Sequence, residues 1–146
     1  MKKITSLLAV SSAAALLFGC AATGGPAKQI HVTGDVYPAI GPYSQMVQTG
    51  NLIFLAGVIP LNKAGNAVQG TTIDDQTRLV LEYIGAKLKS QGIGYENVVM
   101  STVYLKNLND FAAMNKIYAE FFKSQPPARA TVEVARLPRD VLIEIA

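Results

Sequence analysis

The sequence of 146 residues predicts one α+β domain, with two helices packed on one face of a mixed β-sheet. Three observations carry this prediction. Short β-branched and apolar segments alternate with two longer segments of helical periodicity, Gly and Pro residues cluster between them, and 50% of the residues are apolar. The charged fraction of 16% is too low for a disordered chain, and the length suits a single domain with a substantial core.

The first part of this domain is predicted to contain three strands. Residues 29–33 form a short strand, and residues 44–49 and 52–57 form a hairpin around Gly50 and Asn51. A Gly-Asn pair between two strand-like segments is a turn signal. The last of these strands begins with five apolar residues in a row, so we expect it to be covered on both faces.

Two segments are predicted to be helical. Residues 73–91 follow Thr72, which can cap a helix, and end before Gly92. Residues 109–122 carry apolar side chains at helical spacing, and two prolines shortly afterwards prevent the helix from continuing. We expect the basic residues of the first helix to form a solvated face: Arg78, Lys87 and Lys89.

The remaining strands are predicted at residues 98–105, 130–135 and 141–145. The order of elements is then β, β, β, α, β, α, β, β, which places both helices on one side of the sheet. The other face would be too apolar to remain in water, so we expect the chain to associate into an oligomer.

The N-terminal segment is predicted to be an export signal. Lys2 and Lys3 precede 15 uncharged residues, which is the pattern of a signal peptide over residues 1–19. The sequence Leu-Phe-Gly-Cys that ends at Cys20 resembles the lipobox of bacterial lipoproteins. Residues 20–28 would then be a lipidated cysteine and a flexible tether, residues 29–146 the folded domain, and the protein an exported lipoprotein anchored to a membrane. An ordinary signal peptide with a coincidental cysteine is the alternative.

Removal of the signal changes the charge balance. Without Lys2 and Lys3, 11 of the 13 Lys and Arg residues remain against 10 Asp and Glu, a net charge of +1. Such a domain has no strong basis for binding nucleic acid through a positive surface. One Cys and one His, His31, also argue against a disulfide, a zinc cluster and a Ser-His-Asp triad.

Alternation along residues 129–134 suggests where chemistry could occur. It would place Ala130 and Val132 toward the helices, and Arg129 and Thr131 on the opposite face. An arginine held at the start of a strand offers a planar fork to a carboxylate. The alternative is an edge arginine that pairs with a nearby acid: Glu133 or Asp140.

Glu144 is the acidic residue of an otherwise apolar last strand. If Ile143 and Ile145 face the helices, Glu144 should lie on the same side as Arg129. A carboxylate among apolar residues is costly unless it is paired or functional. It could position a water as a general base, or form a structural ion pair with an arginine.

Four segments, in order along the chain, resemble the RidA family, the YjgF-type reactive intermediate deaminases. They lie at residues 39–45, 57–60, 105–111 and 127–145, and the resemblance extends over about residues 29–146. It implies a chorismate-mutase-like α+β protomer, a homotrimer and three clefts between subunits. It also implies hydrolysis of reactive 2-enamine and 2-imino acids to 2-keto acids and ammonia, without a cofactor.

The same resemblance implies roles for individual residues. Arg129 would clamp the substrate carboxylate, Glu144 would position the attacking water, and Tyr43 would close the cleft. Three further positions would bind substrate or border the cleft: Gly57, Thr131 through its backbone, and Asn115.

Three residues depart from the family pattern: Thr131 where Cys is common, and Ala56 and Val58 where many members have Ser and Gln. The last two make the cleft wall more apolar. They leave open a non-catalytic, carboxylate-binding or chaperone-like member of the family. Endoribonuclease activity is a third reading, against which the low net charge argues.

Overall fold

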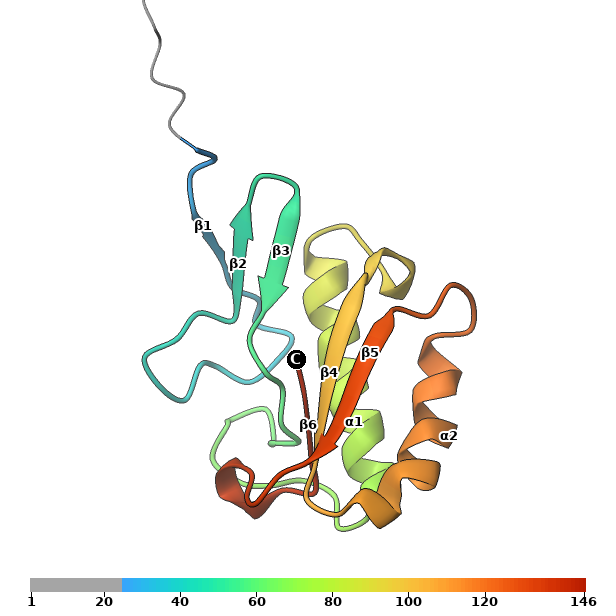
Figure 1. Ribbon diagram of the computed structural model, residues 1–146. Helices are drawn as coiled ribbons and strands as arrows, with labels where there is room; N and C mark the ends of the chain where they lie inside the picture. The colour runs from blue at the N-terminus through green and yellow to red at the C-terminus, as the bar shows by residue number, and fades with distance from the viewer. Residues whose placement is uncertain (1–24) are drawn as a thin grey trace, which may run out of the picture.

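The computed structural model describes residues 25–146 (Figure 1). One antiparallel sheet has the order β1-β2-β3, formed by β1 (Gln29–His31), β2 (Met46–Thr49) and β3 (Leu52–Leu55). The second has the order β5-β4-β6, formed by β4 (Met100–Leu105), β5 (Ala128–Glu133) and β6 (Ile143–Ile145). Since β4 is parallel to β5 and antiparallel to β6, the predicted mixed α+β architecture is confirmed.

A single residue pair joins the two sheets. The amide of Val58 donates to the carbonyl of Ile145 at 2.8 Å, and the amide of Ile145 donates back to Val58 at 3.1 Å. Val58 follows β3 and Ile145 belongs to β6, so the six strands share one helix-covered face with a seam between β3 and β6.

Both helices lie behind the strands or beside them on the same side (Figure 1). They are α1 (Ile73–Ser90) and α2 (Phe111–Phe121). Thr72 caps α1 as predicted, because its hydroxyl accepts a hydrogen bond from the amide of Asp75 at 3.2 Å. Short 3₁₀ turns adjoin these elements: η1 (Tyr95–Asn97), η2 (Leu108–Asp110) and η3 (Pro138–Asp140). No described helix is long and apolar enough to cross a membrane.

The prediction that the basic residues of α1 are solvated is wrong for Lys87. This side chain is 4% exposed, and its Nζ donates to the backbone carbonyl of Ala56 at 3.3 Å. Position 87 lies on the same helical stripe as Val80 and Ile84, which packs against the sheet. This position buries the side chain of Lys87 even though it carries a charge. Burial lowers the pKa of Lys87 from 10.5 to about 8.

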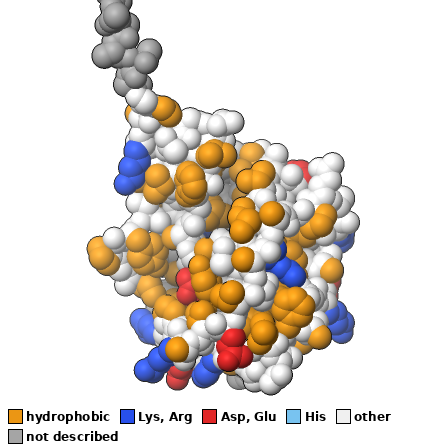
Figure 2. All heavy atoms as spheres, in the orientation of Figure 1, with side chains coloured by type: hydrophobic (Ala, Val, Ile, Leu, Met, Phe, Trp, Pro, Cys, Tyr) orange, Lys and Arg blue, Asp and Glu red, His pale blue; other side chains and the backbone are white. Residues whose placement is uncertain are grey.

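The strand face opposite the helices is not covered within the protomer. Phe54 is 58% exposed there and Leu52 50%, so the expected burial of β3 on both faces does not occur in one chain. Figure 2, in the orientation of Figure 1, shows hydrophobic side chains gathered over the strands. We call this surface the outer face; its exposed apolar residues include Ile30, Leu52, Phe54, Met100 and Val132.

Candidate active site

The predicted orientation of β5 is reversed in the structure. Arg129 pairs with Ser101 and Thr131 with Val103, and Val103 is fully buried beneath the helices. Directly paired residues share a face, so Arg129 and Thr131 point toward α2. Ala130 and Val132 are exposed on the outer face instead. Apolar alternation misled the prediction because this strand has an apolar outer surface and a partly polar inner one.

Arg129 is held by side chains of α2. Its Nη2 donates to Asn115 Oδ1 at 2.6 Å, and its Cζ lies 4.5 Å from the ring centroid of Tyr118 and 5.8 Å from that of Phe111. Tyr118 is itself fixed by a hydrogen bond of 2.8 Å between its hydroxyl and that of Ser101. The rings and the amide orient the guanidinium without neutralising its charge.

The alternative of an edge ion pair does not hold for Arg129. The Glu133 carboxylate accepts a hydrogen bond from the amide of Leu108 at 2.7 Å. Asp140 lies 3.6 Å from Lys106 and 3.5 Å from Arg136. Within residues 25–146, no carboxylate forms a salt bridge with Arg129, so its remaining donors are available to an anionic ligand.

Glu144 lies on the other side of the sheet from Arg129. Its neighbours Ile143 and Ile145 are buried toward the helices, and Glu144 pairs with Tyr104 of β4. Ile143 and Ile145 therefore face the helices, as expected. The expectation that Glu144 shares a face with Arg129 is nevertheless wrong. The reversal of β5 is the reason. Nor does Glu144 form an ion pair with any described residue.

A cavity of about 300 Å³ surrounds Glu144. Tyr43 and Gly57 line it too, so the structure brings together three of the predicted site residues. A Cβ atom at Gly57 would collide with Glu144 Oε1, so a side chain at this position would push the carboxylate out of its present place. The other lining residues are Tyr37, Ile40, Ala56, Ile59 and Pro138. Val58 is buried and absent from this lining, so of the two apolar departures only Ala56 shapes the wall.

Burial sets the protonation behaviour of this cavity. It raises the pKa of Glu144 above its usual value, because the carboxylate form loses hydration. It also raises the pKa of Tyr37 to about 12, so this residue remains a neutral phenol; its hydroxyl accepts from the amide of Ile59 at 3.0 Å. Sequence reasoning missed Tyr37, although its position just before Pro38 placed it at the loop that leads to Tyr43.

Tyr43 lies at the mouth of the cavity. Its side chain is 43% exposed, and its hydroxyl accepts a hydrogen bond from the amide of Ile40 at 3.2 Å. This contact folds the ring back onto its own loop. A ring held only by its own loop can turn toward a ligand without disturbing the core.

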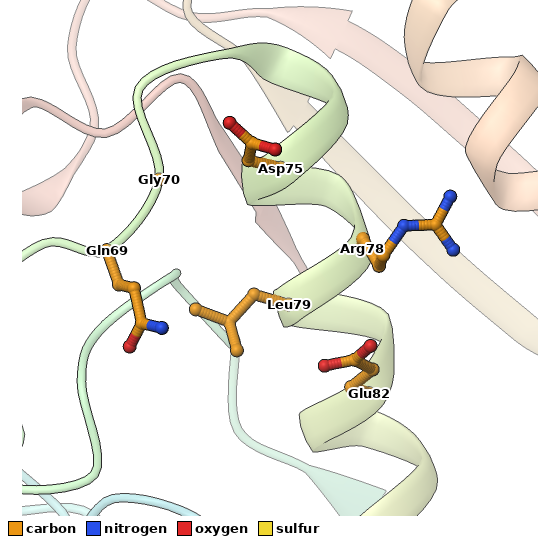
Figure 3. A pocket seen from close by; sticks show the side chains of 6 residues that line it. All are labelled: Gln69, Gly70, Asp75, Arg78, Leu79 and Glu82. Atoms are coloured by element: carbon orange, nitrogen blue, oxygen red, sulfur yellow. The ribbon is translucent and has the colours of Figure 1, made fainter.

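A second cavity, of about 290 Å³, lies beside the first turns of α1 (Figure 3). Asp75 and Glu82 of α1 line it, and Gln69 and Gly70 of the preceding loop form its other wall. Arg78 points away from that loop and makes two hydrogen bonds to Glu120 of α2, at 2.8 and 3.0 Å. None of the predicted site residues lines this cavity, and it is not the candidate site.

Comparison with known proteins identifies the fold and the family. The family model described as Endoribonuclease L-PSP matches residues 34–146. The chain belongs to this family. A RutC family protein of Pyrococcus horikoshii is 52% identical over 119 residues, which cover 81% of this chain and 94% of the relative.

Two further relatives bear on function. Reactive Intermediate Deaminase A of Arabidopsis thaliana, a chloroplastic protein, is 41% identical over 81% of this chain and 63% of its own length. E. coli TdcF, whose crystal structure contains bound serine, is 38% identical with a TM-score of 0.75, over 80% of this chain and 94% of TdcF. The resemblance to the RidA family noted from sequence motifs is therefore confirmed.

Proposed function

We propose that the protein hydrolyses reactive 2-imino acids, and the enamines that tautomerise to them, to 2-keto acids and ammonia. The observation that carries this proposal is the pair of complementary half-sites on one chain. Arg129 offers an unneutralised guanidinium on the helix side of β5, and Glu144 lies in an apolar cavity on the outer face. The relative named as a reactive intermediate deaminase supports the same chemistry.

The reaction needs few groups. Arg129 binds the substrate carboxylate, which fixes the position of the neighbouring C=N carbon. Glu144 accepts a proton from water as the water oxygen bonds to that carbon, and passes it to the nitrogen, which gives a carbinolamine. Glu144 then takes the proton of the new hydroxyl and passes it to the nitrogen as the C–N bond breaks and the C=O bond forms, so both protons of the water leave with ammonia. Water and imine then become ketone and ammonia, with no change in oxidation state. A carboxyl whose pKa is raised toward neutral pH both accepts and returns this proton well.

We propose that these two half-sites meet between protomers of a homotrimer. Arg129 and Glu144 point to opposite faces of their own sheet, so one protomer cannot aim both at one substrate. The uncovered apolar outer face supports association with further copies. A cyclic trimer with head-to-tail contacts would bring Arg129 of each copy to the Glu144 cavity of the next.

Mixing two inactive proteins tests this arrangement. We expect Arg129→Ala and Glu144→Gln each to abolish ammonia release from 2-iminobutyrate. Co-expressed in equal amounts, they should regain about a quarter of wild-type activity, since every mixed trimer contains one interface with both residues intact. Each variant alone, at the same concentration, is the control. If the mixed trimers stay inactive, a site shared between protomers is excluded.

Binding of carboxylates without turnover is the second candidate. Ala56 favours it, because an apolar side chain at this position of the wall gives Glu144 no polar partner for the reaction. Ligand retention with no ammonia release would select this candidate. We do not propose RNA cleavage: His31 Nε2 donates to Gln48 Oε1 at 2.8 Å, and the chain has no second histidine to serve as its acid–base partner.

We also propose that residues 1–19 direct export and that Cys20 carries lipid. Both lie outside the described residues, and the support is the basic, apolar and lipobox-like sequence itself. The wild-type protein should sediment with membranes, and the Cys20→Ser protein should remain in the soluble fraction. Mass spectrometry of the mature N-terminus should find the lipid on Cys20. Equal distribution of the two proteins between fractions would contradict the anchor.

A further inference from the structure

Tyr37 has a buried hydroxyl whose proton is not used within the protomer. The side chain is 6% exposed, and the hydroxyl oxygen accepts a hydrogen bond from the amide of Ile59 at 3.0 Å. No described residue offers an acceptor to the hydroxyl proton itself. Tyr83, which is 4% exposed, instead donates its proton to the carbonyl of Leu61 at 2.8 Å. Because a buried donor without a partner is costly, the proton of Tyr37 is free for an acceptor that the protomer does not supply.

The Tyr37 hydroxyl lies in the wall of the Glu144 cavity. The amide of Val58 bonds to β6, and the next amide, that of Ile59, bonds to Tyr37. Consecutive amides of an extended segment point to opposite edges, so Tyr37 lies on the edge away from β6. Glu144 reaches over Gly57 from the β6 side. Both side chains line the cavity of about 300 Å³, and they enter it from opposite edges of this segment.

The Glu144 carboxylate is near Tyr37 without being bonded to it. Burial is the main reason that the pKa of Tyr37 rises to about 12, and the nearby charge of Glu144 adds to the rise. Two polar groups that are close but not in direct contact can be bridged by a water, and this cavity has the volume for one. Tyr43, the remaining polar side chain of the lining, is held at the mouth by the amide of Ile40.

We propose that the Tyr37 hydroxyl is a further catalytic group, which donates a hydrogen bond to the oxygen of the water that Glu144 activates. This inference rests on the proposed function. The water then has two partners: Glu144 accepts the proton that leaves, and Tyr37 holds the oxygen from another side. Together they fix the position of the water relative to the C=N carbon, which neither group does alone.

The same hydrogen bond acts again when the product forms. The water oxygen becomes the hydroxyl of the carbinolamine and then the oxygen of the keto acid. Negative charge develops on this oxygen as Glu144 removes the hydroxyl proton, and a donor fixed beside it stabilises that charge. Because the pKa of Tyr37 is about 12, the phenol keeps its own proton near neutral pH and remains a donor throughout.

Removal of one oxygen atom from the full chain tests the proposal. Tyr37→Phe keeps the ring and removes the hydroxyl. We expect kcat for ammonia release from 2-iminobutyrate to fall by about 100-fold and KM to stay unchanged, since Arg129 still binds the carboxylate. Tyr83→Phe is the matched control. It also removes a buried phenol hydroxyl that makes one hydrogen bond, but Tyr83 does not line the cavity, so this variant should keep the kcat of the wild type.

Crystal structures separate a catalytic role from a structural one. The wild type should contain a water within hydrogen-bond distance of both the Tyr37 hydroxyl and the Glu144 carboxylate, and Tyr37→Phe should lack it. Both phenylalanine variants lose one buried hydrogen bond, so both should melt at a lower temperature.

Three results overturn the proposal: a wild-type cavity without this water, an undiminished kcat in Tyr37→Phe, or an equal loss of kcat in Tyr83→Phe. Failure of the proposed function gives a different pattern, in which the water is present and the wild type releases no ammonia.

Discussion

At the residue scale, the two half-sites differ in how they are held. Arg129 is positioned by side chains, through the amide of Asn115 and the rings of α2. Glu144 is positioned by the absence of a side chain, because Gly57 leaves the space that the carboxylate occupies.

Gly57→Ala should therefore remove activity while the chain remains folded. The new methyl group would displace the Glu144 carboxylate, and a displacement of about 1 Å can lower a rate by about 100-fold. Gly34→Ala is the control, since nothing lies within 4 Å of a Cβ built at that position. We expect deaminase assays and circular dichroism to show an inactive, folded Gly57→Ala and an active Gly34→Ala. Normal turnover by Gly57→Ala would contradict the role of the Glu144 cavity.

At the scale of elements, helical periodicity predicted both helices, Thr72 was correctly predicted to cap the first, and alternation placed the inner face of β6 correctly. It failed on β5, where Ala130 and Val132 are apolar and yet exposed. Periodicity separates two faces of a strand, but it does not tell which of them meets the helices when both contain small or apolar residues. The rings of Phe111 and Tyr118, which make room for Arg129 beneath α2, become evident only when helix and strand are packed together.

Lys87 shows the same limit on α1, and it gives a measurable consequence. Its pKa falls from 10.5 to about 8 on folding, so the unfolded chain binds the proton more tightly. Burial of the charged amine therefore lowers the free energy of unfolding. This loss has its full size below the pKa of the folded state and disappears as the pH rises toward the pKa of the unfolded state. At pH 7 this loss is about 3 kcal/mol, at 1.36 kcal/mol for each pKa unit.

Urea unfolding at two pH values tests this prediction. Lys87→Met should raise the free energy of unfolding at pH 7, and its advantage over the wild type should shrink by about 1 kcal/mol at pH 9. Lys89→Met, at an exposed position of the same helix, should show no such pH dependence. An advantage that stays constant with pH would mean that the Lys87 amine is not desolvated in the folded state.

At the scale of the whole molecule, the outer face decides whether a site can form. The sequence predicted an oligomer because one sheet face had nothing to cover it, and the exposed Phe54 and Val132 are consistent with that reasoning. The sequence could not indicate that Arg129 and Glu144 lie on opposite faces, since that depends on the register of β4 with both neighbours. Only the assembled sheet shows that one protomer cannot direct both side chains at the same ligand.

A charge on the outer face should separate the protomers and remove activity together. Phe54→Asp places a carboxylate at a 58% exposed apolar position, which an interface would have to desolvate. Lys123→Glu changes the charge at an exposed position just after α2, on the helix side, and is the control. Analytical ultracentrifugation should find monomers for Phe54→Asp and trimers for the control. An active monomer would exclude a site built from two copies.

The bridge between Val58 and Ile145 has a dynamic consequence. These two backbone hydrogen bonds join the segment that follows β3 to β6, and Gly57 and Glu144 are the neighbours of the bonded residues in sequence. Breaking this residue pair would loosen the backbone on both sides of the Glu144 cavity, while the shared hydrophobic core still holds the two halves together. Hydrogen–deuterium exchange at these amides should slow when a carboxylate ligand is bound, which makes them a built-in reporter of occupancy.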